Sequence, residues 1–135
     1  MNPEIKQRWV DALRSGEYHQ TDGMLFQYDP GLDAPYTESF CCLGVLCELA
    51  VEDGVVERAY IYPKDRDQSV GYIATGGKPD EHTQFDILPR VVADWAGLDG
   101  DTIPTPSGYE DSLITMNDDF KLSFQKIADI IEEGF

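Results

Sequence analysis

Three cysteines fall within residues 41–47, and two of them, Cys41 and Cys42, are adjacent. A thiol near the start of a helix gains thiolate character from the helix dipole, which is one way to prepare a nucleophile. A hydrolase also needs a base, and His82 is the only histidine after the cysteines, with Asp80 or Asp86 nearby to orient it. One hypothesis is therefore a cysteine-dependent hydrolase that uses Cys41 or Cys42 with His82.

A structural role for the same thiols is the stronger interpretation. Residues 39–51 are apolar nearly all round, a pattern typical of a helix that is buried on most sides. Free cysteine behaves there as a small hydrophobic residue. An odd, clustered set is not a disulfide framework, and neither His19 nor His82 falls at a zinc-ligand spacing. We therefore expect inert thiols, no metal and no cofactor.

Two polar motifs have weaker chemical meaning. Residues 76–78 (GGK) have donors for a phosphate, but they lack the spacing of a phosphate loop and the Ser or Thr after its lysine. A flexible turn is favoured, although an anionic small ligand at Lys78 stays open. Residues 117–119 (NDD) lack the alternating ligand positions of a calcium loop. A turn or a helix cap is the simpler interpretation.

Large amphipathic side chains are the best candidates for contact with a partner, because interface hot spots favour them. Some of these tyrosines must belong to the core instead. The candidate contact residues are Tyr28, Tyr36, Tyr60, Tyr62, Tyr72, Tyr109 and Lys78.

Helices are predicted at both ends of the chain and at its centre. The first begins at Asn2 as N-cap, followed by Pro3, and can end in a left-handed Gly16. The apolar stripe of this helix places Trp9 in the core. Residues 39–51 form the central helix, in which Gly44 permits close approach of a neighbouring element. Residues 89–97 and 123–131 predict two further helices.

Strands are predicted between these helices. Residues 17–28 indicate a short hairpin or strand pair, and the turn-rich residues 29–35 an exposed loop. Residues 55–62 and 70–73 are rich in β-branched and aromatic side chains, as strands are. The pattern predicts one α+β domain over residues 1–135, with a small antiparallel sheet packed with a buried central helix and amphipathic N- and C-terminal helices.

The charge of the chain restricts its partners. Ten basic against 26 acidic residues give a net charge of −16, which repels nucleic acid phosphates and anionic membranes. We therefore expect no direct duplex DNA binding and no membrane association. The N-terminus lacks the uninterrupted apolar centre of a signal peptide, which predicts a cytoplasmic location. The acidic surface also admits a phosphate-mimicking inhibitor of a DNA-binding protein, although solubility alone explains it more simply.

Four blocks, taken together, resemble a family of small bacteriophage and prophage proteins. They are residues 9–16 (WVDALRSG), 40–47 (FCCLGVLC), 88–98 (LPRVVADWAGL), and 116–118 (MND) followed by 123–132. The second block is the most specific of them, and the four span nearly the whole chain. The resemblance implies an origin rather than an activity: an accessory phage protein that manipulates or counters the host, in the host cytoplasm.

The interpretation favoured by the sequence is a binding protein without catalysis, acting on a host protein or sequestering a small ligand. The thiol hydrolase and the acidic nucleic-acid mimic stay as alternatives. The central expectation is that the cysteine segment is buried and inert.

Overall fold

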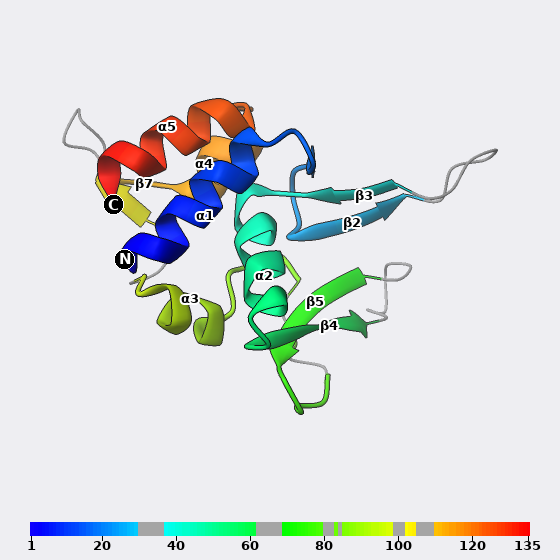
Figure 1. Ribbon diagram of the computed structural model, residues 1–135. Coiled ribbons are helices and arrows are strands. Elements are labelled where there is room, and N and C mark those ends of the chain that lie inside the picture. The colour runs from blue at the N-terminus through cyan, green and yellow to red at the C-terminus, as the bar shows by residue number, and fades with distance from the viewer. Residues whose placement is uncertain (30–36, 62–68, 80–82, 84, 99–101, 105–109) are drawn as a thin grey trace.

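The structure, a computed structural model, describes residues 1–29, 37–61, 69–79, 83, 85–98, 102–104 and 110–135. Helices α1 (Pro3–Arg14) and α5 (Phe124–Gly134) pack against each other on one side of the molecule. Helix α2 (Cys42–Glu52) runs through the centre, and two β-hairpins extend from it in the same direction (Figure 1). The two ends of the chain lie near each other beside α1 and α5.

Helix α1 begins and ends as the sequence predicts. The side-chain oxygen of Asn2 accepts hydrogen bonds from the backbone N–H groups of Glu4 (2.9 Å) and Ile5 (3.3 Å). Pro3 occupies the first helical position, where no donor is needed. After the helix, Gly16 has a φ of 77°, a conformation that costs glycine little. The apolar stripe is buried and includes Trp9, which is 0% exposed.

Helix α2 is the buried centre of the fold, as predicted, but it begins later than expected. Residues 39 and 40 belong to strand β3 (Thr37–Phe40), and Cys41 is the N-cap of the helix. A continuous apolar run suits a buried strand as well as a buried helix, so periodicity could not place this boundary. From Cys42 to Cys47 every residue of the helix is buried.

Gly44 explains how closely α2 packs against its neighbour. A Cβ atom at this position would lie 1.8 Å from the backbone oxygen of Leu25, far inside contact distance. The predicted close approach is therefore confirmed, and the partner is the segment that leads into strand β2 (Phe26–Asp29).

The first sheet corrects the predicted pairing within residues 17–28. Strand β1 (His19–Gln20) and strand β2 do not pair with each other, because β3 lies between them in the order β1-β3-β2. β1 runs parallel to β3, and β2 antiparallel. The end of β3 is bonded on both sides: Thr21 N–H donates to Phe40 O at 2.8 Å, and Cys41 N–H to Leu25 O at 3.4 Å. Sequence proximity favoured a local hairpin, but this non-local pairing replaces it.

The remaining elements follow the predicted order. Strands β4 (Val56–Ile61) and β5 (Ser69–Ala74) form an antiparallel hairpin, and β6 (Thr102–Pro104) pairs with β7 (Glu110–Ser112). Helix α3 (Arg90–Ala96) follows Pro89 and ends at a left-handed Gly97. A short helix, α4 (Leu113–Asp118), was not anticipated. The described residues thus form three small sheets rather than one, and the α+β class is confirmed.

Candidate functional site

The three cysteines lie inside the protein. Cys41 is 4% exposed, and Cys42 and Cys47 are 0% exposed. Burial raises the pKa of the Cys41 thiol to about 11, against the smaller opposing effect of a hydrogen bond from the Gly44 N–H to its sulfur. Burial likewise raises the pKa of Cys47 well above its ordinary value. A protonated thiol without access to solvent is a poor nucleophile.

Cys42 is a point of attachment for the rest of the fold. Its backbone C=O accepts a hydrogen bond from the indole N–H of Trp9 at 2.9 Å. Its backbone N–H donates to the side-chain oxygen of Asn117 at 3.3 Å. Its sulfur donates to the backbone oxygen of Leu113 at 3.6 Å. Residues from α1 and α4 therefore bind the first residue of α2 and fix the direction in which the central helix starts.

The groups proposed to assist a catalytic thiol are His82 as base with Asp80 or Asp86 to orient it. His82 and Asp80 lie outside the described residues. Asp86 is exposed, in the segment between β5 and α3. The pairing of Cys41 or Cys42 with His82 stays a prediction, and the burial of the two thiols is the structural finding that bears on it.

Two of the predicted contact tyrosines are exposed on the two hairpins. Tyr28 on β2 is 37% exposed and Tyr60 on β4 is 50% exposed. Tyr28 lies across from Glu38 of β3, and Tyr60 lies across from Val70 of β5. Both hairpins extend away from the helices on the same side (Figure 1). Tyr36, Tyr62 and Tyr109 lie outside the described residues.

Tyr72 is a correction to that set. It is 3% exposed, and its hydroxyl donates to a carboxylate oxygen of Glu48 at 2.8 Å. On β5 it shares a face with the buried Val70, and this face packs on the core. Burial and then the charge of Glu48 raise the pKa of Tyr72. A residue on the inward face of a strand was therefore mistaken for an exposed contact residue, because period-2 alternation alone does not show which face is inward.

Lys78 is exposed after the β4–β5 hairpin. Gly76 in the same turn has a φ of 87°, and Gly77 N–H donates to Ala74 O at 2.8 Å. This bond closes a turn, and no helix of the described residues starts there to supply further N–H groups to a phosphate. The expected turn is therefore present.

A pocket of about 430 Å³ lies where the first sheet meets α2 and β4. We call it the Arg58 pocket. Three carboxylates and one guanidinium line it, together with aromatic and polar side chains. Its lining residues are Glu17, Tyr18, His19, Thr37, Glu38, Phe40, Glu48 and Arg58.

Arg58 is held at this pocket by carboxylates on two sides. Its Nε donates to Glu48 at 3.0 Å and its Nη1 to Glu38 at 3.2 Å, while its Nη2 is also paired with Glu48. The guanidinium carbon lies 4.8 Å from the centre of the Phe26 ring, within the range of a cation–π contact. These bonds raise the pKa of Arg58 further above its ordinary value, and the bond with Glu48 has the largest effect. Each of the three nitrogens of Arg58 therefore donates to a carboxylate of the protein itself.

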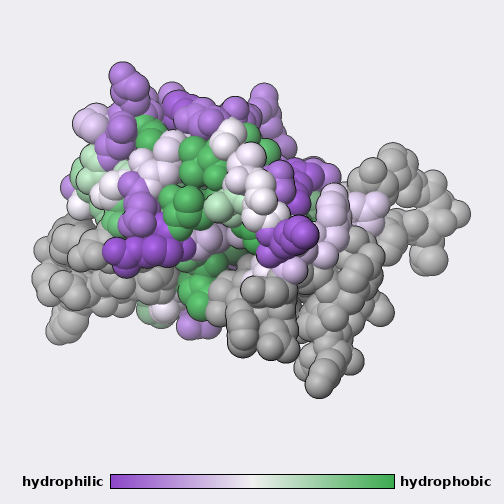
Figure 2. Space-filling model, turned by 90° about the horizontal axis from the view of Figure 1, so that it is seen from below, coloured by the Kyte–Doolittle hydropathy of each residue, from purple (hydrophilic) through white to green (hydrophobic). Residues whose placement is uncertain are grey.

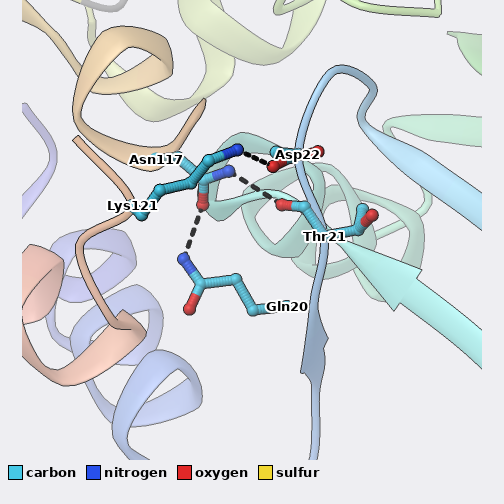
Figure 3. Close-up of a pocket in the computed structure, with 5 residues that line it drawn as sticks. All are labelled: Gln20, Thr21, Asp22, Asn117 and Lys121. Atoms are coloured by element: carbon cyan, nitrogen blue, oxygen red, sulfur yellow. Dashed lines mark hydrogen bonds and ion pairs between the residues drawn. The ribbon is translucent and has the colours of Figure 1, made fainter. Parts of the chain in front are cut away.

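A second pocket of about 380 Å³ opens between β1 and α4 (Figure 3). Asn117, 2% exposed, forms its floor, and an ion pair between Asp22 and Lys121 lies over it. The amide N–H groups of Asn117 donate to Thr21 O and to Asp118, both at 2.8 Å. Its oxygen accepts from Gln20 at 2.9 Å and from the N–H of Cys42. Asn117 is fully bonded within the protein, from a position inside α4 rather than at a helix cap.

Sequence reasoning missed the acidic half of the Arg58 pocket, Glu17, Glu38 and Glu48. A signal was present at Glu48, because it is the one charged residue within the apolar residues 40–51. A carboxylate in a buried helix needs a partner. The identity of that partner depends on the β4 register, which the sequence does not determine.

Two features, a metal-binding cluster and a membrane-spanning helix, are absent from the described residues. No group of three or more histidine, cysteine or acidic side chains is arranged there to hold a metal ion. No helix in the same part of the chain has the length and apolar character to cross a bilayer. Apolar residues do gather near the middle of the face seen from below, and α3 and the β4–β5 hairpin lie on that side of the molecule (Figures 1 and 2).

Fold and site together define a small α+β protein with a buried cysteine helix and two hairpins that carry exposed tyrosines. The family model described as "Domain of unknown function (DUF8296)" matches residues 1–135, so the chain belongs to that family. No match was found among curated proteins or among solved structures.

Proposed function

We propose that this chain is a phage-encoded accessory protein that acts in the host cytoplasm by binding a host protein, without catalysis by its cysteines. The observation that carries the proposal is the exposure of Tyr28 and Tyr60 on two hairpins that extend in the same direction. Tyrosine supplies a large contact area at a low cost in conformational entropy, which is why interfaces favour it. Neither tyrosine is among the residues that line the two described pockets, which favours a protein partner over a small ligand.

The state of the thiols supports binding rather than hydrolysis. The Cys41 thiol, with a pKa of about 11, carries little thiolate at neutral pH. The sulfur of Cys42 is fully buried and bonded to a backbone oxygen. A substrate would have to open the core to reach either atom, at the free-energy cost of losing much of the packing around α2.

The phage origin rests on the resemblance of the four sequence blocks to small phage and prophage proteins. Three of these blocks meet at Cys42, through Trp9, Cys42 itself and Asn117. The blocks therefore have a structural reason to occur together: their residues bind one another in the core. We expect the contacts with the partner on the hairpins instead. In such a phage protein, the residues around Cys42 would maintain the fold, and the hairpins would contact the partner.

The test is capture from a lysate of the host bacterium, with tagged wild type and two double variants. Tyr28→Ser/Tyr60→Ser removes both exposed rings of the hairpins. Ile87→Ser/Phe120→Ser is the matched control, because it removes two other exposed apolar side chains (48% and 58% exposed). We expect mass spectrometry to identify a protein retained by wild type and by the control but lost with the tyrosine variant. Equal retention by all three would contradict the proposal.

A second candidate is an inhibitor that mimics nucleic acid and occupies a DNA-binding protein. The net charge of −16 favours it. The partner of such an inhibitor would release it steeply as salt increases, whereas a contact dominated by tyrosine rings would tolerate salt. Capture at about 50 mM and 500 mM salt separates the two, because only the mimic loses most of its partner at the higher concentration.

A further inference from the structure

The Arg58 pocket has the chemistry of a subsite for a positively charged side chain. Its lining contains three carboxylates against one guanidinium. All three nitrogens of that guanidinium are bonded to Glu38 and Glu48, so an anion would meet these carboxylates on approaching Arg58. A cation meets no such obstacle, because two of the carboxylates remain partly open to solvent: Glu38 is 38% exposed in its side chain and Glu17 is exposed.

Glu17 is the free charge of this pocket. Among the described residues, its carboxylate takes part in no hydrogen bond and no ion pair. An unpaired acid at a pocket edge contributes a negative potential without a competing internal cation. The neighbouring Tyr18 responds to this potential: burial and then the charges of Glu52, Glu48 and Glu17 raise its pKa.

An aromatic wall completes the pocket. Tyr18 and Phe40 both line it, and their rings meet edge to face with centroids 5.4 Å apart. Aromatic faces beside carboxylates attract guanidinium and ammonium groups through the ring quadrupole as well as through charge. The same pairing already occurs within the protein, where Arg58 lies over Phe26 and binds two carboxylates.

The position of the pocket links it to the tyrosine surface. Glu38 lies across from Tyr28 on the β2–β3 hairpin, and Arg58 is two residues from Tyr60 on the same face of β4. A polypeptide that covered the two tyrosines would thus pass the mouth of the Arg58 pocket. The net charge of −16 favours a basic segment over a neutral or acidic one.

We infer that the Arg58 pocket receives an arginine or lysine side chain from a basic segment of the partner protein. This inference rests on the proposed function, because it names the chemistry of the partner that the tyrosine surface binds. Glu17 and Glu38 hold the positive charge, and Tyr18 packs against the alkyl stem or the planar guanidinium.

The test uses N-acetyl-arginine amide as the probe and the uncharged, nearly isosteric N-acetyl-citrulline amide as its control. Both are titrated into the full chain at about 150 mM salt, with backbone amide shifts followed by NMR. The inference predicts saturable shifts at Tyr18, His19 and Glu38 with arginine and none with citrulline. Equal shifts with both probes would overturn it.

Two matched variants distinguish arginine binding in this pocket from non-specific attraction to the acidic surface of the protein. Glu17→Gln removes the unpaired charge and should weaken arginine binding by about three- to fivefold. Glu57→Gln removes one exposed charge from β4 at a position adjacent to Arg58 that points to the opposite face, and it should leave the affinity unchanged. Equal weakening by both variants would show that arginine only samples an acidic surface, and would overturn the inference.

The outcome also distinguishes this inference from the proposed function. If arginine does not bind while capture still depends on Tyr28 and Tyr60, the pocket is overturned and the binding function stands. If arginine binds at the pocket but no host protein is captured through the tyrosines, the proposed function is contradicted, although the pocket does bind a cation.

Discussion

The indole N–H of Trp9 donates a hydrogen bond to the backbone oxygen of Cys42, across 2.9 Å in the interior of the protein. The bond joins α1 to the first residue of α2 and satisfies the indole N–H of Trp9, which has no access to water. On the other side of the same residue, Asn117 binds the Cys42 N–H. The start of the central helix is therefore fixed from two directions by side chains that are distant in sequence.

Trp9→Phe should destabilise the protein by about 1–3 kcal/mol. The phenyl ring keeps most of the packing but removes the buried hydrogen bond from the indole to the Cys42 oxygen, which then keeps only its bond within α2. The smaller ring also leaves a gap at a fully buried site, and the lost bond and the gap together cost this much. Trp95→Phe is the matched control, because Trp95 is half-buried and its indole makes no such hydrogen bond within the described residues. Chemical denaturation measures the free energy of unfolding of both variants. If Trp95→Phe lowers it as much as Trp9→Phe does, the role of the bond is contradicted.

Asn117→Asp should cost at least about 2 kcal/mol, although the two side chains have nearly the same shape. The carboxylate can still accept from Cys42, but it cannot donate to Thr21 O, and it places a charge beside Asp118. A thermal melt as a function of pH checks the cause. The loss should shrink at low pH as the new carboxyl is protonated, and a pH-independent loss would show that charge is not responsible.

Gly44→Ala should prevent stable folding or cost more than about 3 kcal/mol. The added methyl group would lie 1.8 Å from the Leu25 oxygen, a backbone atom that cannot move away cheaply. The natural comparison is Gly77→Ala, whose Cβ would approach Ala74 O only to 3.0 Å in an exposed turn. Circular dichroism melts of the two variants should differ by at least about 10 °C, and similar melts would contradict the close approach.

The pKa of Cys41 predicts how stability depends on pH in the alkaline range. Folding raises this pKa from 9.0 to about 11, so the folded state favours the neutral thiol. Its contribution is fully present below about pH 9 and is lost as pH rises towards about 11, at up to roughly 1.4 kcal/mol per pH unit. Urea unfolding of wild type and Cys41→Ala between pH 8 and 10.5 measures the difference. The variant should lose stability less steeply, and parallel slopes would contradict a buried neutral Cys41.

Much of the frame was predictable because local signals and burial agreed. Asn2 with Pro3 marked the start of α1, and Ser123, whose hydroxyl accepts from Lys126 N–H at 3.3 Å, marked the start of α5. Gly44 was recognised as a point of close approach from its place in an apolar run. In each case the residue type has one dominant physical use at that position.

The pairing of strands and the pocket were not predictable from local pattern. β1 pairs with β3, whose register joins His19 to Ser39, and no local signal encodes a parallel contact over that separation. The same applies to Arg58, whose two carboxylate partners come from β3 and α2. Tyr72 was misassigned because its inward direction depends on how the β4–β5 hairpin packs, rather than on the strand sequence itself.

The central claim is that the cysteine segment holds the frame while the hairpin tyrosines make the contact. It is tested most directly by the affinity of the captured host protein for two variants, measured by biolayer interferometry. Cys41→Ala should bind as wild type does once its folding is confirmed, whereas Tyr28→Ser/Tyr60→Ser should bind at least about tenfold more weakly. Loss of binding with Cys41→Ala and full binding with the tyrosine variant would contradict the account.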